Sequence, residues 1–364
     1  MRIENKMKNT FICTTQYQLF NIVNIIEAYY KSDDNELFIL DCIPNDKLNI
    51  IANRAQVFTN IFNIKTGPIE GNLKSYFMML LNIFVPYMLR LPYDISDRVF
   101  ITSTEIYSRI IAMKLIKKSK CSVYFYEDGL ATYTDVLSKN MLFNKSNKLI
   151  KMRFGSYLIK YCKQVFVYRP EYVINNDFHV PLKKIPRIKV GSKWAERLYN
   201  IFNLDQTKLN VQNKVIYFDS RFLDRKDIED TKIHTKQLAK IIQDKLIIKP
   251  HPSKIDVWKK ENVPIIQTNN SFEILYLLRS FKDNILVSAF STACVLPKII
   301  FDEEPKVILL YNLYRRYPDI WDNGDFIYKK IQAEYSNKKN FWIPLNMSGF
   351  YDNLSEWLED KNTL

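Results

Sequence analysis

The sequence CSVYFYEDG, residues 121–129, decides the fold class. A short run of apolar and aromatic residues before such a turn is typical of a strand buried on both faces of a parallel sheet. Two acidic residues and a glycine follow where this strand is expected to end. In open parallel sheets, ligands bind beyond the carboxyl ends of the strands. The stretch therefore predicts a Rossmann-like sheet and indicates where its chemistry lies.

Similar runs occur on both sides of this stretch and alternate with helical patterns. Strands are expected at residues 10–14, 36–43, 98–102, 121–126, 165–168, 214–218, 246–249, 285–288 and 306–311. Helices are expected at residues 16–30, from about 46, at 105–118, 194–202, 227–242, 271–279 and from about 291, with aromatic helical stretches near Trp321, Trp342 and Trp357. This alternation predicts an α/β protein with parallel sheets covered on both faces.

The length of 364 residues exceeds what one hydrophobic core usually supports, so two domains are expected. The alternation is interrupted between about residues 169 and 213, a segment that we interpret as the interdomain connection. We place the boundary so that the domains comprise residues 1–185 and 186–364. Two successive β/α domains are expected to face a central cleft.

Composition narrows the classes of function. The formal net charge is +14, which indicates an anionic partner such as nucleic acid, a membrane or a phosphorylated substrate, although an AT-rich gene would also yield many lysines. Five scattered cysteines without a CxxC pair, together with three histidines, argue against structural zinc and favour reduced cytoplasmic thiols. No dinucleotide, P-loop or zincin motif occurs, and no DxD-like pair follows a predicted strand, so no metal site is expected.

The longest apolar stretch is FMMLLNIFVPYML, residues 77–89, which is too short to span a bilayer. It predicts a buried core helix. The alternative is a helix that lies on a membrane surface beside Lys74 and Arg90. The N-terminal residues contain no apolar stretch of signal-peptide length.

The first polar cluster at a predicted strand end is Glu127-Asp128-Gly129. Side chains alternate along an extended chain, so one carboxylate is expected to face the ligand while the other braces the loop. A carboxylate in such a place can act as a general base, and Gly129 permits a tight turn. The alternative is a solvated acidic turn.

The second cluster is Lys249-Pro250-His251-Pro252, where the two prolines fix the backbone around the histidine. An imidazole beside a lysine can donate a hydrogen bond to a phosphate oxygen or a proton to a leaving phosphate. The alternative is a structural or merely exposed histidine.

The third cluster contains Ser288, Ser291 and Thr292, where a predicted strand meets a predicted helix. Hydroxyl and backbone N–H groups at a helix N-terminus bind anions, although Ser291 can also serve as a simple N-cap. Glu273 lies in the first turn of another predicted helix, for which Ser271 is the expected N-cap. Its carboxylate either offsets the helix dipole or accepts hydrogen bonds from a ribose diol.

The ordered set of motifs resembles the bacterial sialyltransferases, particularly the lipooligosaccharide sialyltransferase family (glycosyltransferase family 52) and the related polysialyltransferases. The resemblance rests on Glu127-Asp128-Gly129, His251-Pro252, Ser291-Thr292, the opening Thr14-Thr15-Gln16-Tyr17-Gln18-Leu19 and the Phe272-Glu273 pair. The chain departs from the pattern at Thr15, where the family usually carries proline, and at Ser291-Thr292, which replaces a pair of serines.

The resemblance implies a GT-B fold and an inverting transfer of sialic acid from CMP-sialic acid to a bacterial surface glycan, lipooligosaccharide or capsule, with galactose as the expected terminal sugar. No metal or cofactor is implied. Glu127 is favoured over Asp128 as the general base, and His251 would bind the CMP phosphate and assist its departure. Ser291 and Thr292 would hold that phosphate.

The resemblance also divides the substrates between the domains. The C-terminal domain would bind the donor through Lys249, His251, Glu273, Ser288, Ser291 and Thr292, with Glu273 on the cytidine ribose. The N-terminal domain would provide the base and bind the acceptor through Thr14, Thr15, Gln16 and Gly129. The expected location is the cytoplasm, with peripheral attachment to the inner membrane and homodimer formation left open.

Three alternatives remain at the level of the sequence. One is a GT-B transferase with another donor, a UDP-hexose or CMP-Kdo. The second is a basic nucleic-acid-binding protein, although the chain has no dense Lys/Arg run and no RNP-like strand, so we expect no nucleic-acid partner. The third is a non-catalytic protein of glycan export. The acceptor and the linkage are not predicted by the residues.

Overall fold

The structure is a computed structural model. It describes residues 6–41, 47–66, 73–85, 89–92, 95–102, 105–134, 137–139, 142, 144–204, 211, 214–219, 242, 245–251, 258–259, 264–268, 270–277, 279–289, 291–313 and 318–359. The chain divides into two compact units. Unit 1 comprises Met1–Arg187 with Asn200–Phe202, and unit 2 comprises Ile188–Tyr199 with Asn203–Leu364. The boundary expected from the sequence lies two residues before this division.

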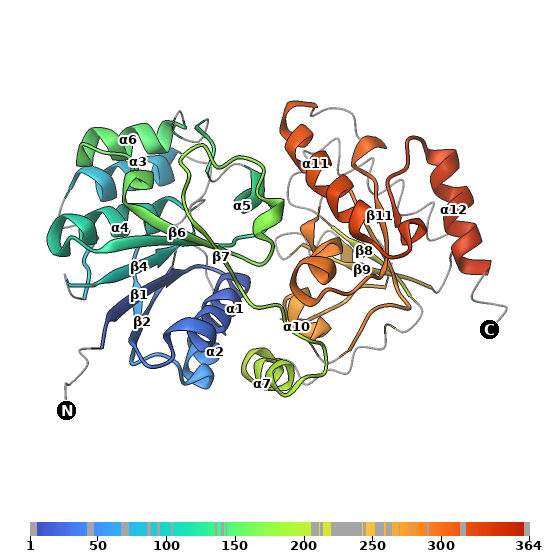
Figure 1. Ribbon diagram of the computed structural model, residues 1–364, viewed down its shortest axis with the longest axis horizontal. Coiled ribbons are helices and arrows are strands. Elements are labelled where there is room, and N and C mark those ends of the chain that lie inside the picture. Colours follow the sequence, from blue (N-terminus) through green and yellow to red (C-terminus); the bar gives the residue numbers. More distant parts are fainter. Residues whose placement is uncertain are drawn as a thin grey trace. The chain divides into compact units, whose positions relative to one another are not determined.

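Unit 1 contains a seven-stranded sheet in the order β3-β2-β1-β4-β5-β6-β7 (Figure 1). All neighbouring strands are parallel. Their bounds are β1 (Lys8–Cys13), β2 (Asp34–Leu40), β3 (Asn60–Ile64), β4 (Arg98–Ile101), β5 (Ser122–Tyr126), β6 (Cys162–Val167) and β7 (Leu182–Lys184). The order reverses between β1 and β4, and such a switch point is where ligands bind in doubly wound sheets.

Helices cover both faces of this sheet. Right-handed connections that leave a switch point in opposite directions place their helices on opposite faces. Accordingly, α1 (Gln16–Ile25) and α2 (Lys47–Ala55) lie on one face, and α3 (Leu73–Phe84), α4 (Ile106–Ser119) and α6 (Lys145–Phe154) lie on the other (Figure 1). A π-helical turn, Ile26–Tyr30, extends α1, and the short α5 (Ala131–Thr134) follows β5. Phe11 and Phe100 stack between β1 and β4 at 4.3 Å.

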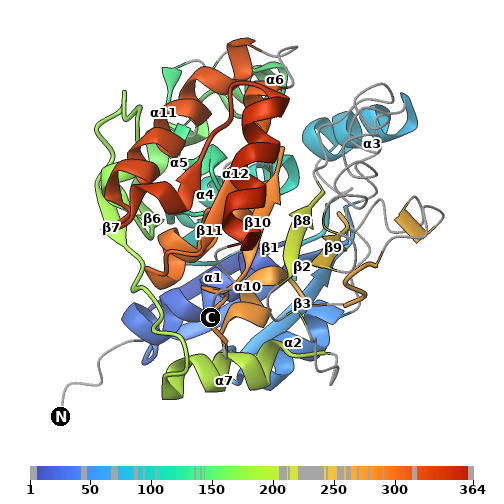
Figure 2. The same cartoon turned by 90° about the vertical axis from the view of Figure 1, so that its right-hand side faces the viewer.

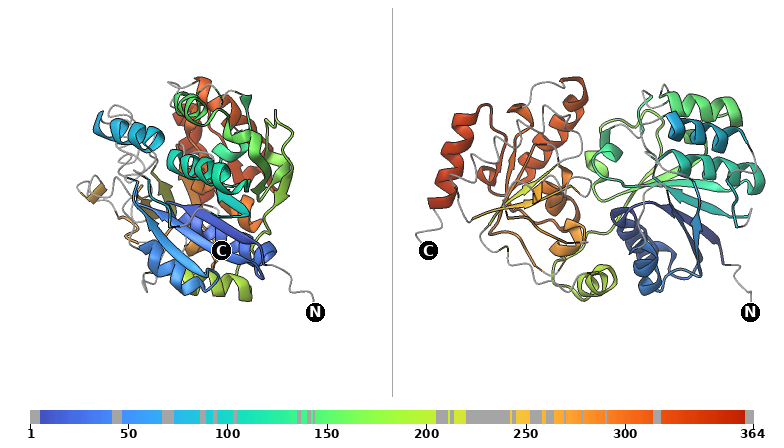
Figure 3. Two further views of the ribbon diagram at one scale, coloured as in Figure 1. Left: turned by 90° about the vertical axis from the view of Figure 1, so that its left-hand side faces the viewer. Right: turned by 180° about the vertical axis from the view of Figure 1, so that it is seen from behind.

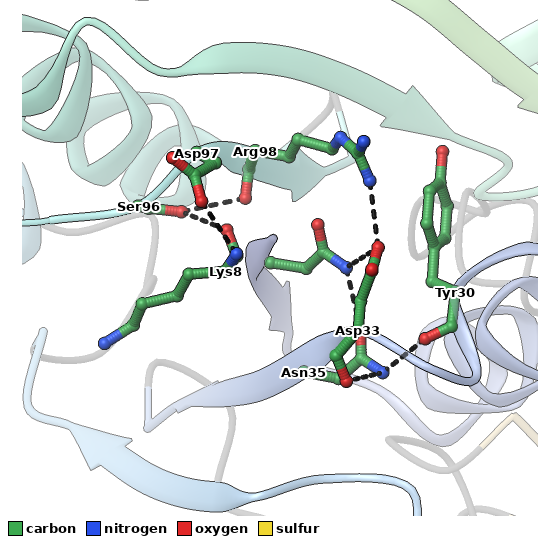
Figure 4. Close-up of polar contacts among 8 residues, drawn as sticks. Lys8, Tyr30, Asp33, Asn35, Ser96, Asp97 and Arg98 are labelled. Carbon is green, nitrogen blue, oxygen red and sulfur yellow. Dashed lines mark hydrogen bonds and ion pairs between the residues drawn. The ribbon is translucent and has the colours of Figure 1, made fainter. Parts of the chain in front are cut away.

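A polar network fixes the amino ends of β1, β2 and β4 (Figure 4). Arg98 forms an ion pair with Asp33 at 3.0 Å. The Lys8 backbone N–H donates to Asp97 at 2.8 Å, and the Asn35 amide donates to the Tyr30 carbonyl at 2.7 Å. Because these groups lie at the start of the strands, they set the register of the sheet and leave its carboxyl edge for function.

Unit 2 contains a five-stranded parallel sheet in the order β12-β11-β10-β8-β9. Four of its strands, β11, β10, β8 and β9, can be followed in turn in Figure 2. The strands are β8 (Val215–Phe218), β9 (Leu246–Lys249), β10 (Ile285–Ser288), β11 (Lys306–Leu309) and β12 (Phe341–Trp342). Among the residues that the structure describes, the helices are α7 (Lys193–Phe202), whose last three residues belong to unit 1, α10 (Phe272–Tyr276), α11 (Pro318–Glu334) and α12 (Met347–Glu359).

Two Rossmann-like parallel sheets confirm the predicted α/β class, but several elements differ from prediction. The sequence missed β3, β7 and β12, and β7 lies inside the expected interdomain connection. Trp342 belongs to β12 rather than to a helix. The helix expected from about residue 291 is a 3-10 turn, Thr292–Cys294, followed by a π-helix, Pro297–Phe301. The helix expected at residues 227–242 lies almost entirely outside the described residues.

The apolar stretch expected as a buried core helix forms α3 only as far as Phe84, and it is only partly buried. Asn82 and Ile83 are buried, whereas Phe77 is 60% exposed and Phe84 is 42% exposed. Over the part of the chain that the structure describes, no helix is long and apolar enough to cross a membrane.

Candidate active site

Glu127 follows β5 and is enclosed by hydrogen-bond donors of unit 1. Its side chain is fully buried. Tyr17 on α1 donates to Oε1 at 3.0 Å. Oε2 accepts from the Tyr133 hydroxyl and from the Tyr168 backbone N–H, the latter at 2.9 Å. An acceptor sugar has no access to a carboxylate that is enclosed in this way.

Burial raises the pKa of Glu127 from 4.5 to about 7, and the hydrogen bonds from Tyr133, Tyr168 and Tyr17 offset only part of the shift. Burial disfavours the charged form, so the folded protein holds this proton more tightly than the unfolded chain does. The free energy of unfolding therefore falls as the pH rises from about 4.5 to about 7. The fall amounts to about 3 kcal/mol.

Glu127→Gln is therefore expected to flatten the dependence of thermal stability on pH. A neutral side chain of the same shape does not titrate. The stability of the variant relative to the wild type is therefore expected to increase as the pH rises from about 4.5 to about 7. Melting temperatures of both proteins between about pH 5 and pH 8 measure the difference. A difference that is constant over this range would contradict a buried, titrating Glu127.

Asp128 occupies a different environment from Glu127. Its side chain is half-buried, and Oδ2 accepts a hydrogen bond from Gln18 Nε2 at 3.1 Å. Its backbone N–H donates to the Thr132 hydroxyl at 2.8 Å, and Gly129 adopts a φ of 78° at the turn. The loop thus turns Asp128 outward from the interior that holds Glu127. The sequence favoured Glu127 as the general base, whereas Asp128 is the more accessible of the two carboxylates.

Residues 14–18 lie beside this loop, as the order of the motifs indicated. The backbone N–H and hydroxyl of Thr14 donate to Gln18 Oε1 at 2.7 and 3.0 Å. The same amide donates to Asp128, so Gln18 connects the end of β1 with the end of β5. Thr15 serves as the N-cap of α1 by accepting from the Gln18 N–H at 3.2 Å, and Gln16 is half-exposed in the first turn.

Thr14 and Thr15 are therefore engaged in local structure, and of the four expected acceptor residues only Thr14 is buried. The sequence had not indicated Gln18, Tyr133, Tyr168 or Asn21 as parts of the site. Asn21 donates to the Glu127 carbonyl at 2.9 Å. A signal for Gln18 was present in its position one turn into the helix that follows a strand end.

In unit 2, the strand ends place the candidate donor residues in one row. Ser288 of β10 pairs with Phe218 of β8, and Phe218 pairs with Lys249 of β9. The loops that carry His251 and Ser291 therefore leave the sheet at the same edge, on either side of β8. His251 is half-buried, and Pro252 lies outside the described residues.

The Ser288 hydroxyl is used within the protein. It donates to the Phe218 carbonyl at 2.9 Å and accepts from the Ser291 N–H at 2.8 Å, and the side chain is fully buried. Ser288 therefore shapes the loop, and its expected contact with the donor stays a prediction.

The expected anion site at a helix N-terminus is also corrected. Ser291 caps a 3-10 turn of three residues, accepting from the Ala293 N–H at 3.3 Å. Since the N–H groups of Ser291 and Ala293 are both engaged, an anion would be held chiefly by the hydroxyls of Ser291 and Thr292, which are half-buried.

Glu273 on α10 is buried, and Lys249 lies within electrostatic range of it. Burial raises the pKa of Glu273, and the nearby positive charge of Lys249 offsets only part of the shift. Ser271 occupies the expected N-cap position, but its side chain forms no capping hydrogen bond. The pairing leaves a carboxyl and an ammonium group at one strand end, suited to a polar ligand that carries both hydroxyl and phosphate groups.

Asp219, directly after β8, is a candidate that the sequence reading overlooked. It accepts from Trp258 Nε1 at 2.9 Å, and both side chains are buried. This bond ties Trp258 to the end of β8. The rule that polar residues after strands mark the site would have identified Asp219.

The described residues contain no group of three His, Cys, Asp or Glu side chains that could hold a metal ion.

A half-buried carboxylate, Asp128, follows a strand of unit 1, and Lys249, His251 and two hydroxyl groups lie at strand ends of unit 2. A family model described as alpha-2,8-polysialyltransferase (POLYST) matches residues 9–310. The chain therefore belongs to the alpha-2,8-polysialyltransferase family. The expected resemblance to bacterial sialyltransferases is confirmed at this level, and the narrower assignment to glycosyltransferase family 52 is not. No curated protein shows a significant sequence match.

Solved structures share the fold at low identity. A Listeria monocytogenes structure named for UDP-N-acetylglucosamine 2-epimerase has 11% identity and a TM-score of 0.51, over 84% of this chain and 79% of that chain. Another UDP-N-acetylglucosamine 2-epimerase has 12% identity and a TM-score of 0.49, over 93% and 90%. A Polygonum tinctorium UDP-glucosyltransferase has 8% identity and a TM-score of 0.45, over 84% and 80%. The likeness to the Listeria monocytogenes structure concerns the fold alone, which is of the GT-B type with two Rossmann-like domains.

Proposed function

We propose that the chain is an inverting sialyltransferase that uses CMP-sialic acid and needs no catalytic metal. The observation that carries the proposal is the outward, half-buried Asp128, oriented by Gln18 at the switch-point edge of unit 1. Membership of the polysialyltransferase family supports the donor.

Asp128 acts as the general base. Its carboxylate takes the proton of the acceptor hydroxyl as the hydroxyl oxygen bonds to the anomeric carbon of sialic acid. The hydrogen bond from Gln18 orients the carboxylate without neutralising it. Glu127 holds the loop from behind through Tyr17, Tyr133 and the Tyr168 backbone.

The unit 2 residues stabilise the leaving group. The bond from the anomeric carbon to the phosphate oxygen breaks, and its electron pair leaves with CMP. Donors from His251, Lys249, Ser291 and Thr292 take up the charge that develops on the phosphate, so this role needs no divalent cation. Glu273 accepts from the ribose hydroxyls.

For the acceptor, we propose a terminal sialic acid of a growing surface glycan, joined through an α2,8 linkage. The family description supports this choice over the galactose expected from the sequence. A galactose end remains the second candidate, and both serve a surface-glycan role in the cytoplasm before export.

Ligand-dependent thermal stability tests the donor. CMP and CMP-sialic acid are expected to raise the melting temperature. At a ligand concentration of one hundred times the dissociation constant, the free energy of unfolding is expected to increase by about 3 kcal/mol. UDP-hexoses are expected to have no effect, and CMP-Kdo a smaller effect than CMP-sialic acid. If a UDP-sugar raised the melting temperature and CMP did not, the proposal would be wrong and a hexosyltransferase would be indicated instead. A shift with arbitrary DNA that salt suppresses would favour the nucleic-acid alternative.

A further inference from the structure

Helices α3, α4 and α6 of unit 1 form a layer on one face of its sheet and contact one another (Figures 1 and 3). We call this layer the basic face. The three helices contain nine Lys or Arg residues and neither Asp nor Glu. The exposed basic residues among those described are Lys117, Lys118, Lys145, Lys148, Lys151 and Arg153.

Helix stability does not explain this distribution. Lysines in a last turn offset the helix dipole, which accounts for Lys117, Lys118, Lys151 and Arg153. Lys145 and Lys148 instead lie in the first turn of α6, where the dipole disfavours cations and where no acidic residue occurs. Their placement points to a ligand outside the helix.

The positive charges are close enough to affect one another. Burial lowers the pKa of Lys114, and the charges of Arg153 on α6 and Lys118 on α4 lower it further. The Lys114 ammonium group donates to the Leu89 carbonyl at 3.1 Å. Charge of one sign thus accumulates across the contact between α4 and α6, and a partner with many negative charges would relieve the repulsion.

Two of these three helices also expose apolar side chains. Phe77 and Phe84 on α3 are 60% and 42% exposed, and Met152 on α6 is 74% exposed between Lys151 and Arg153. Apolar side chains among lysines insert into the boundary between headgroups and acyl chains, while the lysines bind anionic headgroups. A hydrophilic polyanion would make no use of Phe77 or Met152.

We propose that the basic face of α3, α4 and α6 docks unit 1 on a membrane surface of anionic phospholipid. The face combines the two features that reversible attachment requires, acid-free basic helices and exposed aromatic and methionine side chains. The proposal does not depend on the sialyltransferase activity, because binding is measured without donor or acceptor.

Co-sedimentation of the full chain with lipid vesicles tests the docking surface. The protein is expected to bind vesicles of phosphatidylcholine and phosphatidylglycerol, and to bind phosphatidylcholine alone far more weakly. Each lysine near an anionic surface strengthens binding roughly fivefold, so the triple variant Lys145→Gln, Lys148→Gln and Lys151→Gln is expected to lose about a hundredfold. Phe77→Gln is expected to lose about tenfold.

Matched controls lie in unit 2. Unit 2 has three exposed lysines, Lys193, Lys338 and Lys339, and Phe326 on α11 is 53% exposed. The control variants make the same substitutions in this unit, as the triple variant Lys193→Gln, Lys338→Gln and Lys339→Gln and as Phe326→Gln. These variants are expected to bind like the wild type. No binding of the wild type to anionic vesicles, or equal losses in test and control variants, would overturn the proposal. A loss with the lysine triple but none with Phe77→Gln would do so as well, and would indicate a hydrophilic polyanion instead.

Discussion

Asp128→Asn is expected to slow sialyl transfer by about 10²–10⁴-fold while leaving the protein folded. The amide keeps the shape of the side chain, and its oxygen can still accept the Gln18 hydrogen bond, but it cannot take the proton of the acceptor hydroxyl. The loss should appear in kcat with little change in donor affinity, because the proposed donor site lies in unit 2. Initial rates of CMP release at saturating acceptor, together with thermal shifts by CMP, separate the two effects.

Glu127→Gln provides the matched control at the neighbouring position. It is expected to retain much more activity than Asp128→Asn, since a buried side chain held by Tyr17, Tyr133 and Tyr168 acts only through the loop. If Glu127→Gln abolished transfer while Asp128→Asn left it intact, the order of roles assigned to the two carboxylates would be reversed.

His251→Ala is expected to lower the transfer rate by about 10²–10³-fold and to weaken binding of CMP. Alanine has no group that can donate a hydrogen bond or a proton to the departing phosphate. The negative charge that develops on the phosphate is then stabilised less. Kinetics with CMP-sialic acid and the thermal shift by CMP measure the two consequences.

His179→Asn serves as the control for loss of a histidine. His179 is exposed in unit 1 with a φ of 49°, a backbone conformation that asparagine tolerates. This variant is expected to transfer like the wild type. Unchanged kcat and unchanged CMP binding in His251→Ala would remove His251 from the leaving-group role.

The predicted strands that match the structure are mainly those buried on both faces, and the missed strands share a physical cause. The missed strands β3, β7 and β12 each form an edge of a sheet. An edge strand packs against fewer neighbours, so its sequence can be polar, as NIFNI in β3 and LKK in β7 are. The hydrophobic periodicity of a segment cannot identify a strand that forms only when it pairs with a neighbouring strand.

The candidate site shows the same limit. Alternation along the chain predicted that Glu127 and Asp128 point in opposite directions, but it could not tell which one faces inward. That choice is made by Tyr17, Tyr133 and the Tyr168 backbone, which come from three separate parts of unit 1. The internal use of the Ser288 hydroxyl likewise depends on Phe218, seventy residues earlier.

The most direct test of the central claim is CMP release from CMP-sialic acid by the purified protein, with EDTA present and with and without an acceptor that ends in α2,8-linked sialic acid. Release is expected to require the acceptor, to persist in EDTA and to fall sharply in Asp128→Asn and His251→Ala. No release with either sialic acid or galactose acceptors, in a protein that remains folded, would contradict the central claim.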